Sequence, residues 1–251
     1  QENGAGFYQK NLKDGKRHSA ATGFLTPILG RPNLTVRPWS QVRRLRLTGT
    51  RVSGVEYVRQ GVVESVHVAR EVIVCAGAIE SPKVLMLSGI GPAETLRRHG
   101  IAVALDLPGV GGNLHDHPRI GLRWTGRAPL PGSSVSAGLL THSVRGVNPG
   151  APDVQFYVGR GLSAPDPALA FSVVVSRPHS RGTLTLRSAD PFAPPVIQCG
   201  YFTDDRDMDA AVEAVRLAQG LVETRAYDAI RGEAADPPPS DQSPAAIRAF
   251  I

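Results

Sequence analysis

The sequence has few cysteines and no long apolar run. Its 251 residues include 2 cysteines, Cys75 and Cys199, which are too few and too far apart for a disulfide framework. This usage favours a reducing compartment, and we predict a cytoplasmic protein. Cys75 ends an apolar run, where a thiol is expected to pack as a small hydrophobic group. No apolar run approaches the roughly 20 residues that cross a bilayer, so no membrane span is predicted.

Lysine is also scarce, although the formal net charge is +6. The only lysines are Lys10, Lys13, Lys16 and Lys83, so the positive charge comes mainly from arginines that are scattered along the chain. No basic stripe with interleaved aromatic residues is present, and no nucleic-acid partner is predicted. The apolar fraction of 41% and the charged fraction of 20% are ordinary for a globular protein.

Two common catalytic patterns are absent. There is no G-x-S-x-G motif, and His179 and Ser180 are neighbours on a predicted strand, so their side chains should point to opposite faces. This spacing argues against a hydrolase. There is also no G-x-G-x-x-G motif, the usual phosphate-binding turn of dinucleotide sites.

A cluster of polar side chains follows the glycine turn at 109–112. His115, Asp116 and His117 carry groups that suit zinc or iron, but no third ligand with a definite spacing is visible, so no metal is predicted. Two interpretations remain: the imidazoles face a polar cavity beside a cofactor, or the segment is a hydrogen-bonded loop.

Alternating apolar and polar residues predict strands before residue 70. Arg59-Gln60-Gly61 is expected to form a hairpin turn. The run Glu71–Cys75 is continuously apolar after its first residue, which predicts a strand covered on both faces. The alternating segments are 33–39, 41–47, 51–58 and 62–68.

A helix is predicted directly after this buried strand. Ser81 is the expected N-cap, Pro82 the first helical residue and Gly89 the stop. The small residues 76–78 would let a ligand approach the backbone, and the helix N-terminus would favour a phosphate or a nucleotide edge. The alternative is an ordinary strand-turn-helix unit without a ligand.

A stretch rich in proline, glycine and serine near residue 130 predicts a domain boundary. Asp204, Asp205 and Asp207 are expected to favour the N-terminus of a long helix over 204–224 rather than to bind metal. A short helix capped by Ser243 is predicted near the end. Before these come a predicted helix over 92–100 and predicted strands over 101–108, 153–159, 169–178 and 182–188.

These segments together resemble the glucose–methanol–choline oxidoreductases, flavoenzymes that oxidise alcohols. The stretch GAIESPKVLMLSGIG at 77–91 is similar to the second signature of that family. Further segments resemble family segments in the same order, and the likeness is greatest to choline-dehydrogenase-like members. They are GKRHSAATGFLTP, RPNLTV, VSGVEYV, REVIVCAGA, LPGVGGNLHDHP, SRGTLTLRSADP and YFTDDRDM.

The resemblance implies a fold that mixes α+β and α/β features. Residues 1–130 would form part of a Rossmann-like FAD-binding domain, 131–235 a substrate-binding domain with an antiparallel sheet, and 236–251 a linker with the start of a C-terminal segment. FAD is the implied cofactor and a small-molecule alcohol the implied substrate, oxidised by hydride transfer to the flavin. The residues that match cofactor-binding positions are Val42, Ala76, Gly77, Ala78, Asn113 and His117.

The sequence departs from the family pattern at both ends. The family's G-x-G-x-x-G unit precedes the segment that begins at Gln1, and its active-site histidine follows the segment that ends at Ile251. Neither His115 nor His117 matches that histidine, so no catalytic residue is predicted. We expect an interior fragment, completed by a complementing segment, or alternatively a non-catalytic remnant or split-gene product with weak ligand binding. The particular alcohol and the electron acceptor are not encoded in any recognisable motif.

Overall fold

The computed structural model describes residues 4–127, 137–141, 151–160, 168–236 and 240–251. Its contacts divide the chain into two compact units, each built from separated segments. Unit 1 comprises 1–10, 115–181 and 200–251, and unit 2 comprises 11–114 and 182–199. The predicted domain limits at 130 and 235 stay a prediction.

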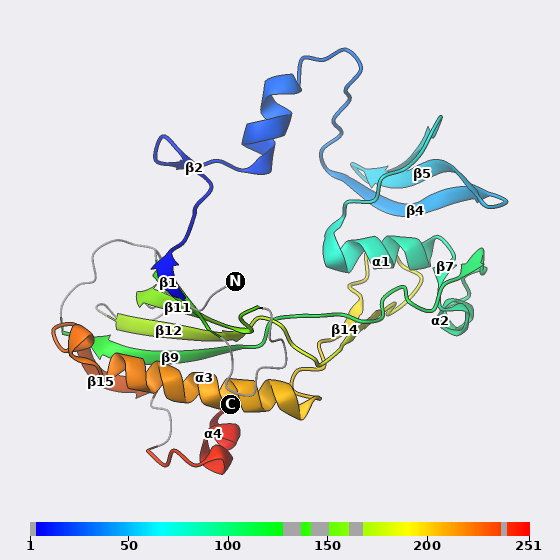
Figure 1. Cartoon of the computed structure of the whole chain (residues 1–251). Coiled ribbons are helices and arrows are strands. Elements are labelled where there is room, and N and C mark those ends of the chain that lie inside the picture. Colours follow the sequence, from blue (N-terminus) through cyan, green and yellow to red (C-terminus); the bar gives the residue numbers. More distant parts are fainter. Residues whose placement is uncertain (1–3, 128–136, 142–150, 161–167, 237–239) are drawn as a thin grey trace. The chain divides into compact units, whose positions relative to one another are not determined.

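Unit 1 is built on a six-stranded antiparallel sheet with the order β1-β10-β11-β12-β9-β15 (Figure 1). The sequence predicted antiparallel strands over the segments that form β11 and β12, and both are confirmed. The strands are β1 (Gly4–Phe7), β9 (Arg119–Gly126), β10 (Ala137–Thr141), β11 (Val154–Arg160), β12 (Ala168–Val175) and β15 (Arg231–Asp236).

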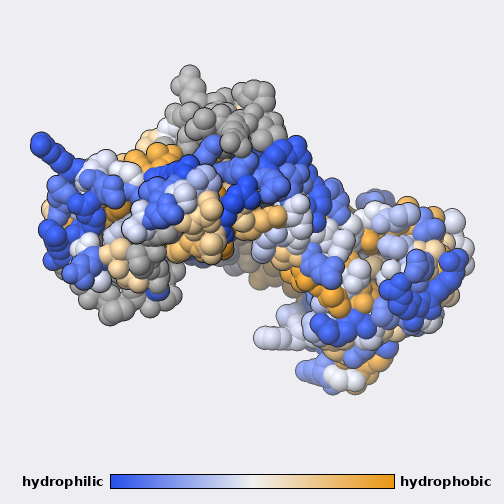
Figure 2. Space-filling model, turned by 90° about the horizontal axis from the view of Figure 1, so that it is seen from below, coloured by the Kyte–Doolittle hydropathy of each residue, from blue (hydrophilic) through white to orange (hydrophobic). Residues whose placement is uncertain are grey.

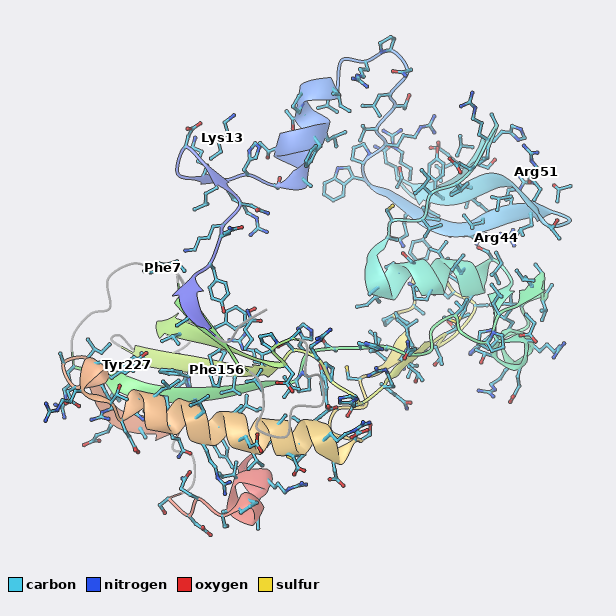
Figure 3. All side chains as sticks on the ribbon, viewed as in Figure 1. Phe7, Lys13, Arg44, Arg51, Phe156 and Tyr227 are labelled. Atoms are coloured by element: carbon cyan, nitrogen blue, oxygen red, sulfur yellow. The ribbon has the colours of Figure 1, made fainter. Side chains whose placement is uncertain are left out.

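One face of this sheet is covered by α3 (Asp205–Val222), the helix that the sequence predicted there (Figure 1). Alternate residues of β11 and β12, such as Phe156 and Phe171, are fully buried against alanine and valine side chains of the helix. Phe171 meets Trp124 edge-on at 5.8 Å and Tyr227 at 5.6 Å between ring centroids. Figure 3 labels Phe156 and Tyr227 in this layer. Burial of this apolar face is the main stabilising contribution in unit 1.

Acidic residues fix the start of α3, as predicted. Asp204 is the N-cap, and its carboxylate accepts the Arg206 backbone N–H at 3.0 Å. The Arg206 side chain also binds it, and these hydrogen bonds hold the pKa of Asp204 well below its usual range. Asp207 has a different role that the sequence did not reveal: it is 1% exposed and accepts the backbone N–H groups of His179 and Ser180, both at 2.7 Å.

The last helix, α4 (Pro244–Phe250), packs on α3. Ser243 is its N-cap and accepts the Ala246 N–H at 3.2 Å, which confirms the prediction. Ile247 is fully buried, while Arg248 bridges Asp205 at 3.2 Å and Asp209 at 2.5 Å. Figure 2 views this side of unit 1 and shows hydrophilic residues interspersed with apolar ones.

Unit 2 contains the antiparallel meander β4 (Ser40–Thr48), β5 (Arg51–Arg59) and β6 (Val62–His67). These three predicted strands are confirmed. So is the hairpin turn, because Gln60 and Gly61 have φ values of 51° and 78°, as a tight turn between twisted strands requires. Figure 3 labels Arg44 on β4 and Arg51 on β5.

Helix α1 (Gly77–Leu87) packs against β4, and Leu45 of the strand and Val84 and Leu87 of the helix are buried. The predicted N-cap at Ser81 is wrong, because the N-cap is Ala76, five residues earlier, and Pro82 lies inside the helix. The predicted stop is confirmed: Gly89 has φ 82°, and a Cβ there would lie 2.4 Å from the Ala102 carbonyl oxygen. The C-cap Ser88 connects helix and sheet, since its Oγ accepts the Leu45 N–H at 2.8 Å and donates to Val84 O at 2.6 Å.

The predicted strand at Glu71–Cys75 is not formed. Ile73 is 77% exposed and Cys75 is also exposed, so the expected burial of both faces and of the thiol is wrong as well. A strand needs a neighbour to accept and donate its ladder hydrogen bonds, and no described segment pairs with these residues.

Short elements complete unit 2. No strand forms over 33–39, and within 101–108 only β8 (Leu105–Asp106) forms, so these two predictions fail for most of their length. The predicted helix over 92–100 is confirmed as α2 (Ala93–Arg98). The predicted strand over 182–188 shrinks to β13 (Thr183–Thr185). The other elements are β2 (Leu12–Lys13), β3 (Lys16–Arg17), η1 (Ala21–Leu25), η2 (Thr26–Ile28), β7 (Ile90–Gly91), β13 (Thr183–Thr185) and β14 (Val196–Gln198), with η3 (Arg225–Tyr227) in unit 1.

The fold class is α+β, which confirms the mixed class expected from the sequence. Parallel pairing in the described residues is confined to β7 with β8. None of the described helices has the length and the apolar character that crossing a bilayer requires.

Replacing Ser88 should show how strongly the helix depends on its link to β4. Ser88→Ala leaves the buried Leu45 N–H without an acceptor, which should lower the free energy of unfolding by about 1–3 kcal/mol. Urea unfolding measures the change. Ser65→Ala, at an exposed serine of β6, is the matched control and should change stability little.

Asp207 gives a second stability prediction. Asp207→Asn keeps the size of the side chain but replaces one acceptor oxygen by an amide that faces a backbone N–H donor. We expect a loss of about 2 kcal/mol, measured by thermal and urea unfolding. Asp205→Asn, in the same turn but 90% exposed at its side chain, should cost much less. Equal losses for the two variants would refute the anchoring role of Asp207.

Candidate functional site

The N-terminus of α1 brings three predicted cofactor-binding residues together. Ala76 is the N-cap, Gly77 and Ala78 are the first two helical residues, and all three are exposed. Gly77 has φ 83°, a conformation that favours glycine. No side chain caps the first turn, so its backbone N–H groups and the positive end of the helix dipole face outward. This arrangement suits an anionic group.

A cleft of about 270 Å³ adjoins this helix end. One wall is the α1 face formed by Ala78, Ser81, Pro82 and Leu85, and the opposite wall is the glycine loop 109–112. Half of the lining residues are glycine, alanine or serine, so a ligand could approach backbone groups there. The small-residue turn predicted from the sequence therefore lies beside a real hollow.

The glycine loop is held by a contact that the sequence did not indicate. The Leu184 N–H donates to Gly111 O at 2.7 Å, and a Cβ on Gly111 would lie only 2.1 Å from Leu184 O. Leu114 and Gly182 exchange both backbone hydrogen bonds, at 2.9 and 2.8 Å. Leu184 also lines the cleft and packs with Met86 and Leu96. The only sequence signal was a run of glycines, which does not identify the distant partner.

Val42 lies on β4, opposite Tyr57, and a bulge follows it before Arg44. Its side chain is half-buried. Figure 1 shows β4 and α1 running in the same general direction, and Leu45 is bonded to the C-cap of the helix. Val42 therefore lies about 10 Å back along the strand, toward the N-terminal half of α1.

Asn113 and His117 are separated by the division between the units. Asn113 directly follows the glycine loop in unit 2 and has φ 55°, an uncommon value for a residue other than glycine. His117 belongs to unit 1 and is exposed; its backbone N–H donates to Asp116 Oδ1 at 2.9 Å. The Tyr201 hydroxyl donates to the other Asp116 oxygen. Asp116 thus orders the segment through hydrogen bonds, and the orientation of the imidazoles toward a cofactor stays a prediction.

Charge near the helix start comes from an unusual lysine. Lys83 is 4% exposed, and its Nζ lies 3.3 Å from Glu80 Oε2 within the first turns of α1. The pair places a compensated positive charge in the helix. Within the described residues, no three His, Cys, Asp or Glu side chains converge as metal ligands would.

Gly111 can be tested directly. Gly111→Ala combines a backbone φ of 80° with a Cβ that would overlap Leu184 O, so we expect unfolding to become easier by about 2–4 kcal/mol. Gly109→Ala is the matched control in the same loop, because no atom lies within 4 Å of the added Cβ. Thermal unfolding of both variants measures the difference, and similar stabilities would contradict the close-contact argument.

Known proteins share this arrangement of sequence and fold. The two models of the GMC oxidoreductase family match residues 1–119 and 178–250. Choline dehydrogenase, a mitochondrial protein of Mus musculus, is 35% identical over 100% of this chain and 47% of its own length. The chain thus spans about half the length of the curated relatives that it matches.

Solved structures agree with the sequence match. Pyridoxine 4-oxidase from Mesorbium loti superposes with a TM-score of 0.89 at 28% identity, over 99% of this chain and 51% of that protein. A formate oxidase of Aspergillus oryzae RIB40, studied for its FAD modification, has the same fold with a TM-score of 0.79 at 24% identity, over 89% of this chain and 50% of its own. The resemblance noted in the sequence is therefore confirmed, and the chain belongs to the GMC oxidoreductase family.

Proposed function

We propose that this chain is the central part of an FAD-dependent oxidoreductase that acts on the CH–OH group of a small alcohol. The observation that carries the proposal is the uncapped N-terminus of α1, which opens beside the cleft and the glycine loop in a chain of the GMC family. FAD is the cofactor that the family membership supports.

The residues present fit an extended dinucleotide. Gly77 and Ala78 offer backbone N–H donors, and the space beside Gly77 is open, since a Cβ there would meet no atom within 4 Å. These groups would hold an anionic part of FAD. The main chain of Val42 would meet the adenine, because a backbone N–H and C=O can bind an adenine edge without a special side chain. Asn113 and His117 are proposed to lie on the flavin side.

FAD, when bound, supplies the hydride acceptor, and the chain described here binds and orients it. No catalytic base is assigned to this chain. Two similar proteins are named for choline and pyridoxine, and both compounds carry alcohol groups. These names support an alcohol as the substrate. The identity of that alcohol depends on side chains of the cavity and is not proposed further.

We propose that a complementing polypeptide segment completes the site. Glu71–Cys75 has no pairing strand in the described structure, Ile73 within it is exposed, and the chain spans about half the length of its relatives. A strand added beside 71–75 would pair its free backbone groups and bury Ile73. The same exposure also favours a second candidate, a non-catalytic remnant that binds FAD weakly.

We propose a cytoplasmic location on a separate observation. Cys75 and Cys199 are both free thiols, and Cys75 is exposed. Exposed free thiols persist in a reducing compartment.

Titration of the purified chain with FAD tests the cofactor site. We expect the flavin fluorescence to change saturably, and Ala78→Leu, which fills the cleft beside the helix start, to weaken binding roughly tenfold or more. Ala189→Leu is the control, because Ala189 is exposed and does not line this cleft. Equal affinity of the two variants would place FAD elsewhere.

Turnover separates the two candidate functions. The FAD complex is mixed with primary alcohols and an artificial electron acceptor, with and without a polypeptide that carries the G-x-G-x-x-G unit and the C-terminal segment of a relative. Activity that appears only with the added polypeptide supports the first candidate, an FAD-dependent oxidoreductase that is completed by a complementing segment. No activity in either mixture, together with weak FAD binding, would leave the non-catalytic remnant as the better account.

A further inference from the structure

The segment that follows β14 turns sharply at Tyr201. The residues on either side, Gly200 and Phe202, have φ values of 65° and 55°, in the left-handed region. Glycine adopts this conformation freely, whereas phenylalanine does so only under constraint. The hydroxyl of Thr203 closes the turn by donating to Gly200 O at 2.9 Å. Phe202 packs against the core of unit 1 while Tyr201 is 45% exposed, so the strained turn directs the tyrosine away from the core.

The exposed tyrosine has a definite partner 85 positions earlier in the chain. Its hydroxyl donates to Asp116 Oδ2. The other carboxylate oxygen, Asp116 Oδ1, accepts the backbone N–H of His117 at 2.9 Å. Asp116 is therefore held from two sides, and it connects Tyr201 to the backbone of His117.

The backbone of His117 has little freedom. Its N–H is bonded to Asp116, and the following Pro118 restricts it to extended conformations. Pro118 is itself buried, and its carbonyl oxygen accepts the Val175 N–H at 3.1 Å. His117 is nevertheless exposed, and within the described part of the chain no hydrogen bond engages its imidazole. A fixed backbone thus presents an uncommitted imidazole.

Stability alone gives little reason for this arrangement. Asp116 and Tyr201 are both exposed, so their polar groups could bond water instead, which leaves only a small net gain from their hydrogen bond. The left-handed conformation of Phe202 adds an opposing cost. Strained residues of this kind cluster at functional sites, where the strain is part of how a group is held. The strain beside Tyr201 therefore points to a functional use of its contact with Asp116.

We propose that Tyr201 is a positioning residue of the flavin site: through Asp116 it fixes the backbone of His117 and so orients the His117 imidazole for FAD. The inference rests on the proposed function, in which His117 lies on the flavin side. Tyr201 needs no contact with the cofactor for this role. Orienting His117 in advance strengthens binding, because less conformational entropy is then lost when the complex forms.

The first test uses the chain without FAD. Tyr201→Phe keeps the ring and removes the hydroxyl that holds Asp116, so the His117 amide should exchange with solvent roughly tenfold faster, as measured by NMR. Tyr227→Phe is the matched control, because Tyr227 lies in the same unit, beyond the C-terminal end of α3, and the variant should leave this exchange rate unchanged. An unchanged rate in Tyr201→Phe would overturn the connection through Asp116.

Titration with FAD then tests whether Tyr201 acts through the imidazole. Tyr201→Phe and His117→Ala should each weaken binding roughly tenfold, but the double variant should bind no more weakly than His117→Ala alone. A merely structural role of Tyr201 would not produce this dependence. Ala78→Leu changes a different part of the proposed site, so its effect should multiply with that of Tyr201→Phe. Thermal unfolding verifies that each variant is folded.

The outcomes separate this inference from the proposed function. The inference alone is wrong if the parent chain binds FAD and Tyr201→Phe binds it as tightly. It is also wrong if the effects of Tyr201→Phe and His117→Ala multiply, because the tyrosine would then act independently of the imidazole. Failure of the parent chain to bind FAD would overturn the proposed function and this inference with it.

Discussion

The α1 cleft depends on the close approach of two backbones, that of Gly111 and that of Leu184. Their hydrogen bond of 2.7 Å and the absence of a Cβ at Gly111 place the glycine loop against the segment that follows Gly182. The same segment contributes Leu184 and Leu186 to the cluster around Met86 and Leu96. The loop that forms one wall of the cleft is thus supported by the small apolar core beneath α1.

A second common feature is the use of single polar side chains where regular backbone pairing ends. Ser88 satisfies the Leu45 N–H between helix and sheet, and Asp207 satisfies two N–H groups beside the start of α3. Each buried donor would otherwise remain unpaired at a substantial cost in free energy. Replacing either of these polar side chains should therefore lower the stability of its unit, although neither residue lines the α1 cleft.

Elements with a strong local period could be predicted from the sequence. The helix α3, the meander β4-β5-β6 and the capped helix α4 were all expected, because the information for each lies within a few neighbouring residues. The strand at 71–75 failed for the opposite reason: its apolar run is suited to burial, but a strand also needs a partner. The predicted start of α1 was wrong because Ser81-Pro82 has the sequence pattern of a helix start although it lies inside the helix.

The candidate site was predictable in the same uneven way. Residues 76–78 were predicted as a turn ahead of the helix and instead form its start, beside a hollow; the role of each candidate in binding FAD stays a prediction. Leu184, which completes the lining, left no local signal, because it meets the glycine loop from 73 positions further along the chain (184 − 111 = 73). Asp207 was likewise read as one of three helix-start acids rather than as the anchor of a turn.

The interleaved order of the two units has a consequence for synthesis. Gly111 of the glycine loop is added 73 residues before Leu184. At translation rates of about 5–20 residues per second, this is a delay of roughly 4–15 s. During that interval much of unit 1 is made, while Met86 and Leu96 have no Leu184 to cover them. The nascent chain must therefore keep an apolar surface from aggregating until a later segment arrives.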